Sequence, residues 1–398
     1  MFLKTPGEVD DMAIDRIKVA TVYLGRMGGA PIYALSMAKA LDKLCEQRVF
    51  LSSSIENAEK WKESELNCSF YETFDSTMQA LLSLILSKNL YTLKRDIIDF
   101  EPDVIYYPMS HLWDYRISRT VKRELGKAIV VETVHDPLMH SGEKLLRRLA
   151  DGQFNKAIRA SDKCVILSSV FRKIMASRYG FNTQDILVLP HGVFDYYTQF
   201  DGQDSGIPKR ARFRIGFVGR ISRYKGVDLL LEAFKGLWKE HDAELLIAGS
   251  GAIAESEKQI IDQLPEERIT VINRWLTHQE IAKYICSTDI LVCAYRDGTQ
   301  SGVASAAYAL GVPVVVSDSG GLPEQAGYGE YALVVKAGDS RSLAQGITSL
   351  LTNKDERERL SSNALAHARR SLSWEILAKK LVGFLSNTPT NPNDGENS

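Results

Sequence analysis

Short apolar runs alternate with longer amphipathic stretches along most of this chain. Residues 18–24, 48–54 and 102–108 are runs of strand length that are rich in β-branched and aromatic side chains. The stretches between such runs repeat apolar residues at helical spacing, as residues 31–44 do. This alternation predicts an α/β fold whose parallel sheets carry helices on both faces.

The rest of the first half continues the same pattern. A long amphipathic stretch predicts a single helix over residues 75–98. Pro31 stands at the first position of the helix expected over 31–44, where its missing N–H costs nothing. The turn before it, Gly28-Gly29, brings the backbone close to whatever lies above the sheet edge. Further strands are expected at residues 128–136, 162–169 and 185–193.

The pattern is interrupted once, near the middle of the chain. Residues 196–211 lose their apolar periodicity and collect Asp, Gly, Ser and Pro, which is the composition of a linker. A chain of 398 residues is long enough for two domains on either side of it. The predicted division is a loosely ordered lead-in at 1–15, a first Rossmann-like domain at 16–195, the linker, a second Rossmann-like domain at 212–370, a C-terminal helix at 371–385 and a disordered tail at 386–398.

Residues 288–324 combine a strand, a glycine-bearing turn, a helix and a second strand in one unbroken run. The helix is expected to begin near Ser301, whose side chain or that of Thr299 can cap the first free amides. The amides of Gly302 and Val303 then point out of the turn, and such a helix end binds anions. Ordinary turns of a doubly wound domain would show the same glycine spacing, so the spacing alone leaves both interpretations open.

Composition and charge exclude several classes of protein. The hydrophobic fraction of 44% and the charged fraction of 25% are those of a globular protein, and a net charge of −1 gives no sign of nucleic-acid binding. The five cysteines are scattered without a metal-ligand spacing, so we expect reduced thiols and no metal site. No apolar stretch approaches the roughly 20 residues that span a bilayer, and the N-terminus has no apolar signal core. We therefore expect a cytoplasmic protein.

Five segments, in order, resemble the motifs of one enzyme family. They are GGA at 28–30, VLPHGVFD at 188–195, FVGRISRYKGVDLLLEAF at 217–234, LLIAGSG at 245–251 and AYRDGTQSGVASAAYALGVPVVVSDSGGLPE at 294–324. From about Ile17 to Leu385 the chain is similar to the retaining glycosyltransferases of family 4. These have the GT-B architecture, in which two Rossmann-like domains face each other across a cleft.

The resemblance implies a function for each half of the chain. A nucleotide-diphosphate sugar would be held mainly by the C-terminal half, and a glycan or lipid-linked acceptor mainly by the N-terminal half. No cofactor is implied, because the nucleotide sugar is a co-substrate. The helix at 371–385 would cross back and pack on the N-terminal domain. The setting implied is polysaccharide or glycoconjugate biosynthesis.

Arg220 and Lys225 are the cations that best suit a departing diphosphate. They are five positions apart around a strand-to-helix turn, so both can converge on one anion above the sheet edge. Fixed cations there stabilise the leaving group more in the transition state than in the ground state, and a metal is then unnecessary. The alternative is that both are solvated cations of a loop.

The other candidates depend more strongly on the resemblance. It places His135, at the end of a strand, beside the transferred sugar, although a lone His at a strand end often has only a structural role. Glu324 matches a position that contacts hydroxyl groups of the donor, and Arg274 is expected near the base. Further donor contacts are expected from Gly219, Gln300, Ser301, Gly302 and Val303, acceptor-side contacts from Gly28 and Gly29, and His111, His140 and His191 are further histidines to be considered.

One departure from the family pattern concerns acidic residues. Many members carry two Glu eight positions apart, and the matching positions here are Gly298 and Ala306. Asp297 can take part of the first role, but an Asp is also a good turn former. The TQSGV version suggests a subgroup of the family. The missing acids leave open a non-catalytic GT-B-like subunit that binds a nucleotide sugar or a glycan, and also a sugar-nucleotide epimerase of the same architecture.

Residues 141–178 are rich in basic side chains. They hold nine Lys and Arg against three acidic residues, an excess of six positive charges. A cationic face beside an acceptor cleft would suit a lipid-linked pyrophosphate or a peripheral contact with an anionic membrane. A solvated helical face balanced by acids elsewhere is the alternative.

Overall fold

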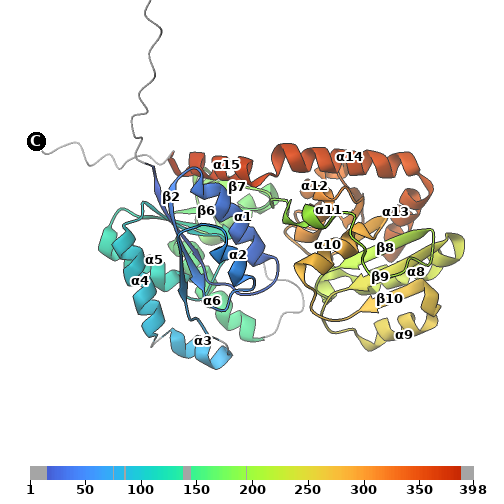
Figure 1. The fold of residues 1–398 in the computed structure, drawn as a ribbon, viewed down its shortest axis with the longest axis horizontal. Helices are drawn as coiled ribbons and strands as arrows, with labels where there is room; N and C mark the ends of the chain where they lie inside the picture. Colours follow the sequence, from blue (N-terminus) through green and yellow to red (C-terminus); the bar gives the residue numbers. More distant parts are fainter. Residues whose placement is uncertain (1–15, 75, 85–86, 138–144, 194, 387–398) are drawn as a thin grey trace, which may run out of the picture.

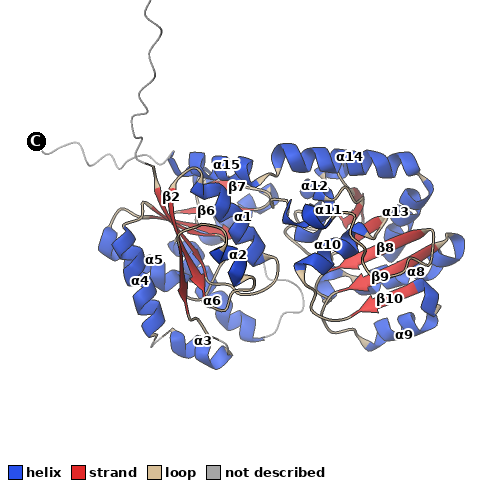
Figure 2. Ribbon diagram, viewed as in Figure 1, coloured by secondary structure: helices blue, strands red, loops and turns tan. Residues whose placement is uncertain are grey.

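The structure of the protein is a computed structural model that describes residues 16–74, 76–84, 87–137, 145–193 and 195–386. The predicted lead-in at 1–15, the tail beyond residue 386 and His140 lie outside these residues. The chain forms two parallel sheets, one in each half, with helices on both faces (Figures 1 and 2). The predicted fold class, two doubly wound Rossmann-like domains, is confirmed.

The sheets have strand orders that sequence periodicity does not reveal. The first is β3-β2-β1-β4-β5-β6-β7 and the second is β10-β9-β8-β11-β12-β13. The first sheet consists of β1 Lys18–Tyr23, β2 Glu46–Ser52, β3 Cys68–Tyr71, β4 Val104–Tyr107, β5 Ile129–Val134, β6 Lys163–Ile166 and β7 Ile186–Val188. The second sheet consists of β8 Phe213–Val218, β9 Ala243–Ala248, β10 Ile269–Ile272, β11 Ile290–Cys293, β12 Val314–Ser317 and β13 Leu333–Val335.

The helices of the first half depart from the prediction at one place. They are α1 Ala30–Asp42, α2 Ala58–Lys62, α3 Thr77–Ser83, α4 Lys88–Phe100, α5 Asp114–Leu125, α6 Leu145–Ala160 and α7 Arg172–Ile174. The single helix predicted over 75–98 is wrong, because α3 and α4 are separate. The Ser87 hydroxyl accepts the Leu90 amide and so begins α4 anew. The continuous apolar pattern did not reveal this new helix start, which depends on the hydroxyl of Ser87 as a local hydrogen-bond acceptor.

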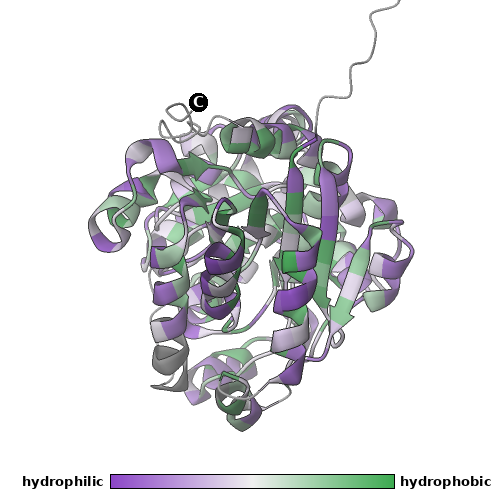
Figure 3. Cartoon of the chain, turned by 90° about the vertical axis from the view of Figure 1, so that its left-hand side faces the viewer, coloured by the Kyte–Doolittle hydropathy of each residue, from purple (hydrophilic) through white to green (hydrophobic). Residues whose placement is uncertain are grey.

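The helices of the second half follow the predicted pattern closely. They are α8 Val227–Glu240, α9 Glu255–Gln263, α10 His278–Cys286, α11 Gly302–Ala309, α12 Leu322–Gln325, α13 Ser340–Thr352, α14 Lys354–Ser371 and α15 Trp374–Ser386. In a side view the strands at the centre are mostly hydrophobic and the surrounding helices carry hydrophilic stretches (Figure 3). Each sheet is therefore buried by the apolar stripes of its own helices.

The last helix does not stay with the half that precedes it. Helix α15 packs against α1 of the first half, and the Trp374 indole donates to the Val193 carbonyl over 2.7 Å. The Lys163 ammonium donates to the carbonyl of Phe384 over 2.8 Å. The rings of Trp374 and Tyr33 meet edge to face, 5.0 Å apart. Aromatic burial and these hydrogen bonds hold the C-terminal helix on the N-terminal half (Figure 1).

Composition led us to expect reduced cysteines and no membrane-spanning segment, and the described residues bear on both points. All five cysteines are free, and burial raises the pKa of the Cys164 thiol. None of the described helices combines the length and the apolar character that a bilayer crossing needs.

Two carboxylic acids are buried together in the first half. Glu132 in β5 is fully buried, and Asp114 at the start of α5 is 1% exposed. Neither carboxylate oxygen of Glu132 meets a donor in good hydrogen-bond geometry among the described residues. Burial raises the pKa of Glu132 to about 8, and burial together with Glu132 raises the pKa of Asp114. The folded chain therefore keeps a proton here that the unfolded chain would release.

Replacing Glu132 by Gln is expected to stabilise the protein mainly at alkaline pH. Because the pKa of this acid is raised on folding, the free energy of unfolding of the parent falls as pH rises from about 4.3, the unfolded value, to about 8. The Gln variant lacks this proton linkage. Thermal unfolding near pH 5 and near pH 9 should show a gain for Glu132→Gln that is larger at the higher pH. Glu124→Gln, at the exposed end of α5, is the control, and a gain independent of pH would contradict the raised pKa.

Candidate active site

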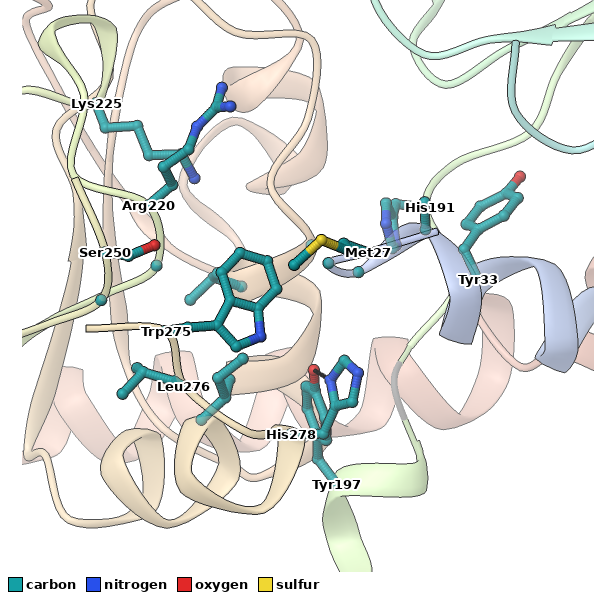
Figure 4. A pocket seen from close by; sticks show the side chains of 18 of the residues that line it. Met27, Tyr33, His191, Tyr197, Arg220, Lys225, Ser250, Trp275, Leu276 and His278 are labelled. Atoms are coloured by element: carbon teal, nitrogen blue, oxygen red, sulfur yellow. Dashed lines mark hydrogen bonds between the residues drawn. The ribbon is translucent and has the colours of Figure 1, made fainter. Parts of the chain in front are cut away.

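A pocket of about 580 Å³ lies between the two halves of the chain. Figure 4 shows Arg220 and Lys225 together on one side, Tyr33 and His191 on the other, and Met27 and Trp275 extending into the space between them. The first half contributes Met27, Gly28, Gly29, Ala30, Tyr33, Met109, His135 and His191, and the predicted linker contributes Tyr197. The second half contributes Gly219, Arg220, Lys225, Gly249, Ser250, Trp275, Leu276, His278, Ile281, Gly302 and Val303. Turns that follow strands of both sheets therefore form much of the pocket wall.

The cationic side of the pocket is built by the turn after β8. Lys225 is half-buried, and its ammonium donates to the Tyr295 hydroxyl over 2.9 Å. Burial acts to lower the pKa of Lys225, but Tyr295 and Tyr224 outweigh it, so the pKa is raised and the side chain is charged at neutral pH. Arg220 is exposed and makes no hydrogen bond or ion pair with the residues that the structure describes. Two positive charges are therefore available to an anion in the pocket.

The start of α11 faces the same space. The Ser301 hydroxyl accepts the Ala304 amide, which makes Ser301 the N-cap, and Gly302 and Val303 line the pocket. A methyl group placed on Gly219 would lie 3.6 Å from Val303 and 3.7 Å from the Lys225 ammonium. The turn after β8, the helix start and the lysine therefore border one small space. Free amides and a fixed cation around one space are suited to a phosphate group.

The histidines lie on the side of the first half. His135, at the end of β5, lines the pocket, and its Nε2 lies 2.9 Å from the Pro108 carbonyl, to which it must donate its proton. His191 also lines it, and its Nδ1 donates to the Gly192 carbonyl over 2.8 Å. Burial lowers the pKa of His135 and brings that of His191 to about 4. Both imidazoles are therefore neutral near pH 7.

Four predicted site residues do not line the pocket. Gln300 accepts the His191 amide over 2.7 Å and donates to the Leu167 carbonyl over 2.6 Å. Ser301 is buried, where it caps α11 and contacts Tyr295. These two side chains bond to residues around the pocket and do not line it. Their expected contact with the nucleotide-sugar donor stays a prediction.

The other two, Glu324 and Arg274, are held by partners of their own. The Glu324 carboxylate accepts the Ser168 hydroxyl over 2.6 Å and the Ser169 amide over 2.9 Å, so it joins α12 to the first half. Arg274 forms a two-pronged ion pair with Glu280. Their predicted roles at the donor would require these bonds to be exchanged for bonds to a ligand.

Of the additional histidine candidates, one lines the pocket and one lies elsewhere in the first half. His191 lines the pocket, as described above, whereas His111 does not. His111 stacks on Phe74 with the ring centres 5.2 Å apart, and burial lowers its pKa to about 3. His111 therefore has a structural environment in the first half.

The prediction from sequence missed much of the pocket wall. Trp275 is 46% exposed, and its indole donates to Glu56 across the cleft over 3.2 Å. The second oxygen of Glu56 accepts the Gly28 amide over 3.0 Å. Tyr33 and His278 also line the pocket. An exposed Trp directly after a strand can be recognised in the sequence as a candidate binding residue. Nothing in the sequence around Glu56, 219 positions away, indicates that it is the partner of this Trp.

Four side chains of the basic segment at 141–178 make contacts within the protein. The Lys163 ammonium binds the Phe384 carbonyl, and Arg172 donates to the Ile186 carbonyl over 3.1 Å. The guanidinium groups of Arg159 and Arg178 lie 5.6 and 5.4 Å from the centre of the Tyr179 ring. These contacts fix the positions of four cations on the first half, but none of the contacts is an ion pair, so the positive charges are kept.

Two protein-family models match the chain, one in each half. The model described as Glycosyltransferase Family 4 matches residues 27–194, and the model described as Glycosyl transferases group 1 matches residues 200–367. Together they cover every strand of the two sheets except β1, and every residue of the pocket wall except Tyr197. The boundary between the two matches falls where residues 196–211 join the halves.

Individual proteins of known name or solved structure are also similar to this chain. D-inositol 3-phosphate glycosyltransferase of Corynebacterium urealyticum is 33% identical over 198 residues, which are 48% of this chain and 46% of that protein. The match thus spans about half the length of this curated relative. The crystal structure of Anabaena HepE in complex with UDP and glucose has a TM-score of 0.73 at 16% identity and covers 94% of this chain and 100% of that one. Sucrose-phosphate synthase of Thermosynechococcus elongatus has a TM-score of 0.68 at 17% identity and covers 93% and 98%.

Proposed function

We propose that this chain, which belongs to family 4 of the glycosyltransferases and has their GT-B fold, moves a sugar from a nucleotide-diphosphate sugar to a glycan or lipid-linked acceptor. One observation carries the proposal. Arg220, Lys225 and the start of α11 surround one space on the C-terminal side of a pocket whose opposite wall is built by the first half. This is the arrangement that a diphosphate leaving group and a separate acceptor require.

The donor assignment draws support from the solved structures. The HepE structure binds UDP and glucose, and a second HepE structure at 17% identity binds UDP-glucose. The pocket of this chain offers cations and free amides for the diphosphate and Trp275 as an apolar face beside them. We propose that the cations balance the charge that develops on the leaving phosphate, so that transfer needs no metal ion.

We further propose that the transfer retains the anomeric configuration. An inverting enzyme needs a general base opposite the leaving group, and a double displacement needs a carboxylate there. None of the described residues that line the pocket is acidic, so none of them supplies a carboxylate nucleophile, and Nε2 of His135 donates to Pro108 and is not a base. An inverting mechanism would have to use His191, whose proton on Nδ1 leaves Nε2 as an acceptor. In the retaining mechanism that we propose, the acceptor hydroxyl attacks from the face that the diphosphate leaves and passes its proton to that phosphate.

The acceptor itself is identified only by class. Gly28 and Gly29 lie on its side of the pocket. The basic segment at 141–178 supports a lipid-linked acceptor or a peripheral membrane contact through its excess of positive charge. A soluble phosphorylated acceptor is consistent with the same wall, since the curated relative is named for inositol 3-phosphate.

The stereochemical outcome tests the proposal directly. With a donor that is α-linked to its diphosphate, we expect an α-linked product, because attack and departure occur on one face. The coupling of the anomeric proton in the NMR spectrum of the product distinguishes the two anomers. The donor is first found by thermal shift with a panel of nucleotide sugars, where a ligand at about 100 times its dissociation constant adds about 2.7 kcal/mol of stability.

Three outcomes would contradict parts of this proposal. A β-linked product from such a donor would exclude retention even if transfer itself were confirmed. A complete and reversible loss of transfer in excess EDTA would show that a metal ion is required. Binding of a nucleotide sugar without transfer to any acceptor tried would favour the non-catalytic partner subunit, which the missing acids at Gly298 and Ala306 motivate.

A further inference from the structure

Lys225 is held by a hydroxyl group rather than by a carboxylate. Its ammonium nitrogen lies 2.9 Å from the Tyr295 hydroxyl and 4.5 Å from the centre of the Tyr295 ring. Within the part of the chain that the structure describes, Lys225 forms no ion pair with an acidic side chain. Tyr295 is 3% exposed and lies between the lysine and the start of α11. The charge on Lys225 is therefore supported but not neutralised by the protein.

Hydrogen bonds connect Tyr295 to Lys225 and to Ser301. An ammonium group can only donate, so the Tyr295 oxygen accepts from Lys225, and the hydroxyl groups of Tyr295 and Ser301 share a hydrogen bond over 2.9 Å. The Ser301 oxygen also accepts the Ala304 amide over 3.3 Å. The Ser301 hydroxyl also shares a hydrogen bond with the sulfur of Cys293, 3.7 Å away. A continuous row of hydrogen bonds thus runs from Lys225 through Tyr295 and Ser301 to Cys293.

This row of hydrogen bonds is anchored to rigid parts of the second sheet. Cys293 is the last residue of β11, and Ser301 caps α11. The Ser301 amide donates to the Gln325 side chain over 2.8 Å, and Gln325 donates back to the Ser301 carbonyl over 2.9 Å. A hydroxyl fixed in this way determines where the ammonium of a flexible lysine side chain can sit.

We propose that Tyr295 is a positioning residue that aims the Lys225 ammonium at the diphosphate of the donor. The inference rests on the proposed function, since it assigns a task at the same site. Tyr295 touches the lysine and not the pocket, which it does not line. Its hydroxyl holds the ammonium next to Gly219 and Val303, at the place where the leaving phosphate would meet the helix start.

A phenol suits this task better than a carboxylate would. Burial raises the pKa of Tyr295, so the hydroxyl stays neutral and accepts a hydrogen bond without cancelling the positive charge. The full charge of Lys225 is then left for the leaving group, where it stabilises the transition state. The positions where the family often carries acids are Gly298 and Ala306 here, so no glutamate from them competes for the ammonium.

Replacing Tyr295 by Phe tests the proposal because it removes only the hydroxyl. We expect kcat to fall about tenfold while the KM for the donor changes less than about threefold. The reason is that a displaced Lys225 ammonium stabilises the leaving diphosphate less well, and this interaction matters mainly in the transition state. A purely structural role would not separate the effect on kcat from the effect on KM in this way.

A double-mutant cycle separates this inference from the proposed function. In the Lys225→Met background, Tyr295→Phe should cause no further loss, because the hydroxyl acts only through the lysine. A further tenfold loss in that background, or a parental rate for Tyr295→Phe alone, would overturn the positioning role. If Lys225→Met itself transferred sugar at the parental rate, the diphosphate site of the proposed function would be wrong instead.

The control removes a comparable hydroxyl from the same half. Tyr308 is also fully buried, and its hydroxyl donates to the Gln325 carbonyl over 3.3 Å without contacting Lys225. Tyr308→Phe should change the unfolding temperature about as much as Tyr295→Phe and leave kcat near the parental value. A tenfold loss in both variants would show that kcat reports general loosening of the second half, and the proposal would fall.

Discussion

Replacing Lys225 or Arg220 by Ala is expected to lower the rate of sugar transfer at least about tenfold, which corresponds to about 1.4 kcal/mol of transition-state stabilisation in each case. Both side chains line the pocket, and no carboxylate among the described residues pairs with either of them. Each variant removes a charge that should act on the departing diphosphate. Turnover at saturating donor is the measurement.

Stability should be almost unaffected in these two variants. Arg220 is exposed, and the side chain of Lys225 is held by Tyr295 alone among the hydrogen bonds of the described residues. Lys235→Ala is the matched control, because Lys235 lies nearby on α8 and pairs with Glu232 over 3.0 Å, away from the pocket. Parental turnover in both Lys225→Ala and Arg220→Ala would mean that the diphosphate does not bind at this turn.

Replacing Gly249 by Ala is expected to destabilise the second half by about 3 kcal/mol or more and to abolish most of the activity. Gly249 has a φ of +149°, and an added Cβ would lie 1.8 Å from the carbonyl oxygen of Gly219. The backbone of the turn after β8 would have to move. That turn carries Arg220 and leads to Lys225, so strain and misplacement of the cations arise together.

The matched control for Gly249 is a glycine where a methyl group has room. Gly236 lies inside α8, and an added Cβ there meets nothing within 4 Å. Gly236→Ala should raise the free energy of unfolding by up to about 1 kcal/mol, because Ala favours the helix. Thermal unfolding and turnover of both variants give the comparison. Equal effects of the two substitutions would show that the contact between the two turns is not rigid.

The cations of the site could be predicted from the sequence because their proximity is local. Arg220 and Lys225 sit on one turn between β8 and α8, and a spacing of five residues around such a turn brings both to the sheet edge. The same holds for Ser301, Gly302 and Val303, since capping chemistry acts within one helical turn. For these residues the pattern of strand, turn and helix was sufficient to predict their position at the sheet edge, whereas their contact with a diphosphate stays a prediction.

The contacts that close the pocket could not be predicted in this way. Trp275 meets Glu56, Glu324 meets Ser168, and Lys225 meets Tyr295, across 219, 156 and 70 positions of the chain. Each pair is brought together by the strand orders and by the packing of one half on the other. A periodic pattern carries no information about partners so far apart.

The sequence by itself determined that this chain is an α/β protein with glycine-bearing turns and cations at one sheet edge, because periodicity, capping and turn chemistry act over a few residues. Only the tertiary structure decided that α15 covers α1, that Glu324 joins α12 to the first half, and that Tyr295 holds the lysine. These outcomes depend on which buried surfaces and hydrogen-bond partners meet when two sheets pack. That choice is made by the whole folded chain and not by any one segment.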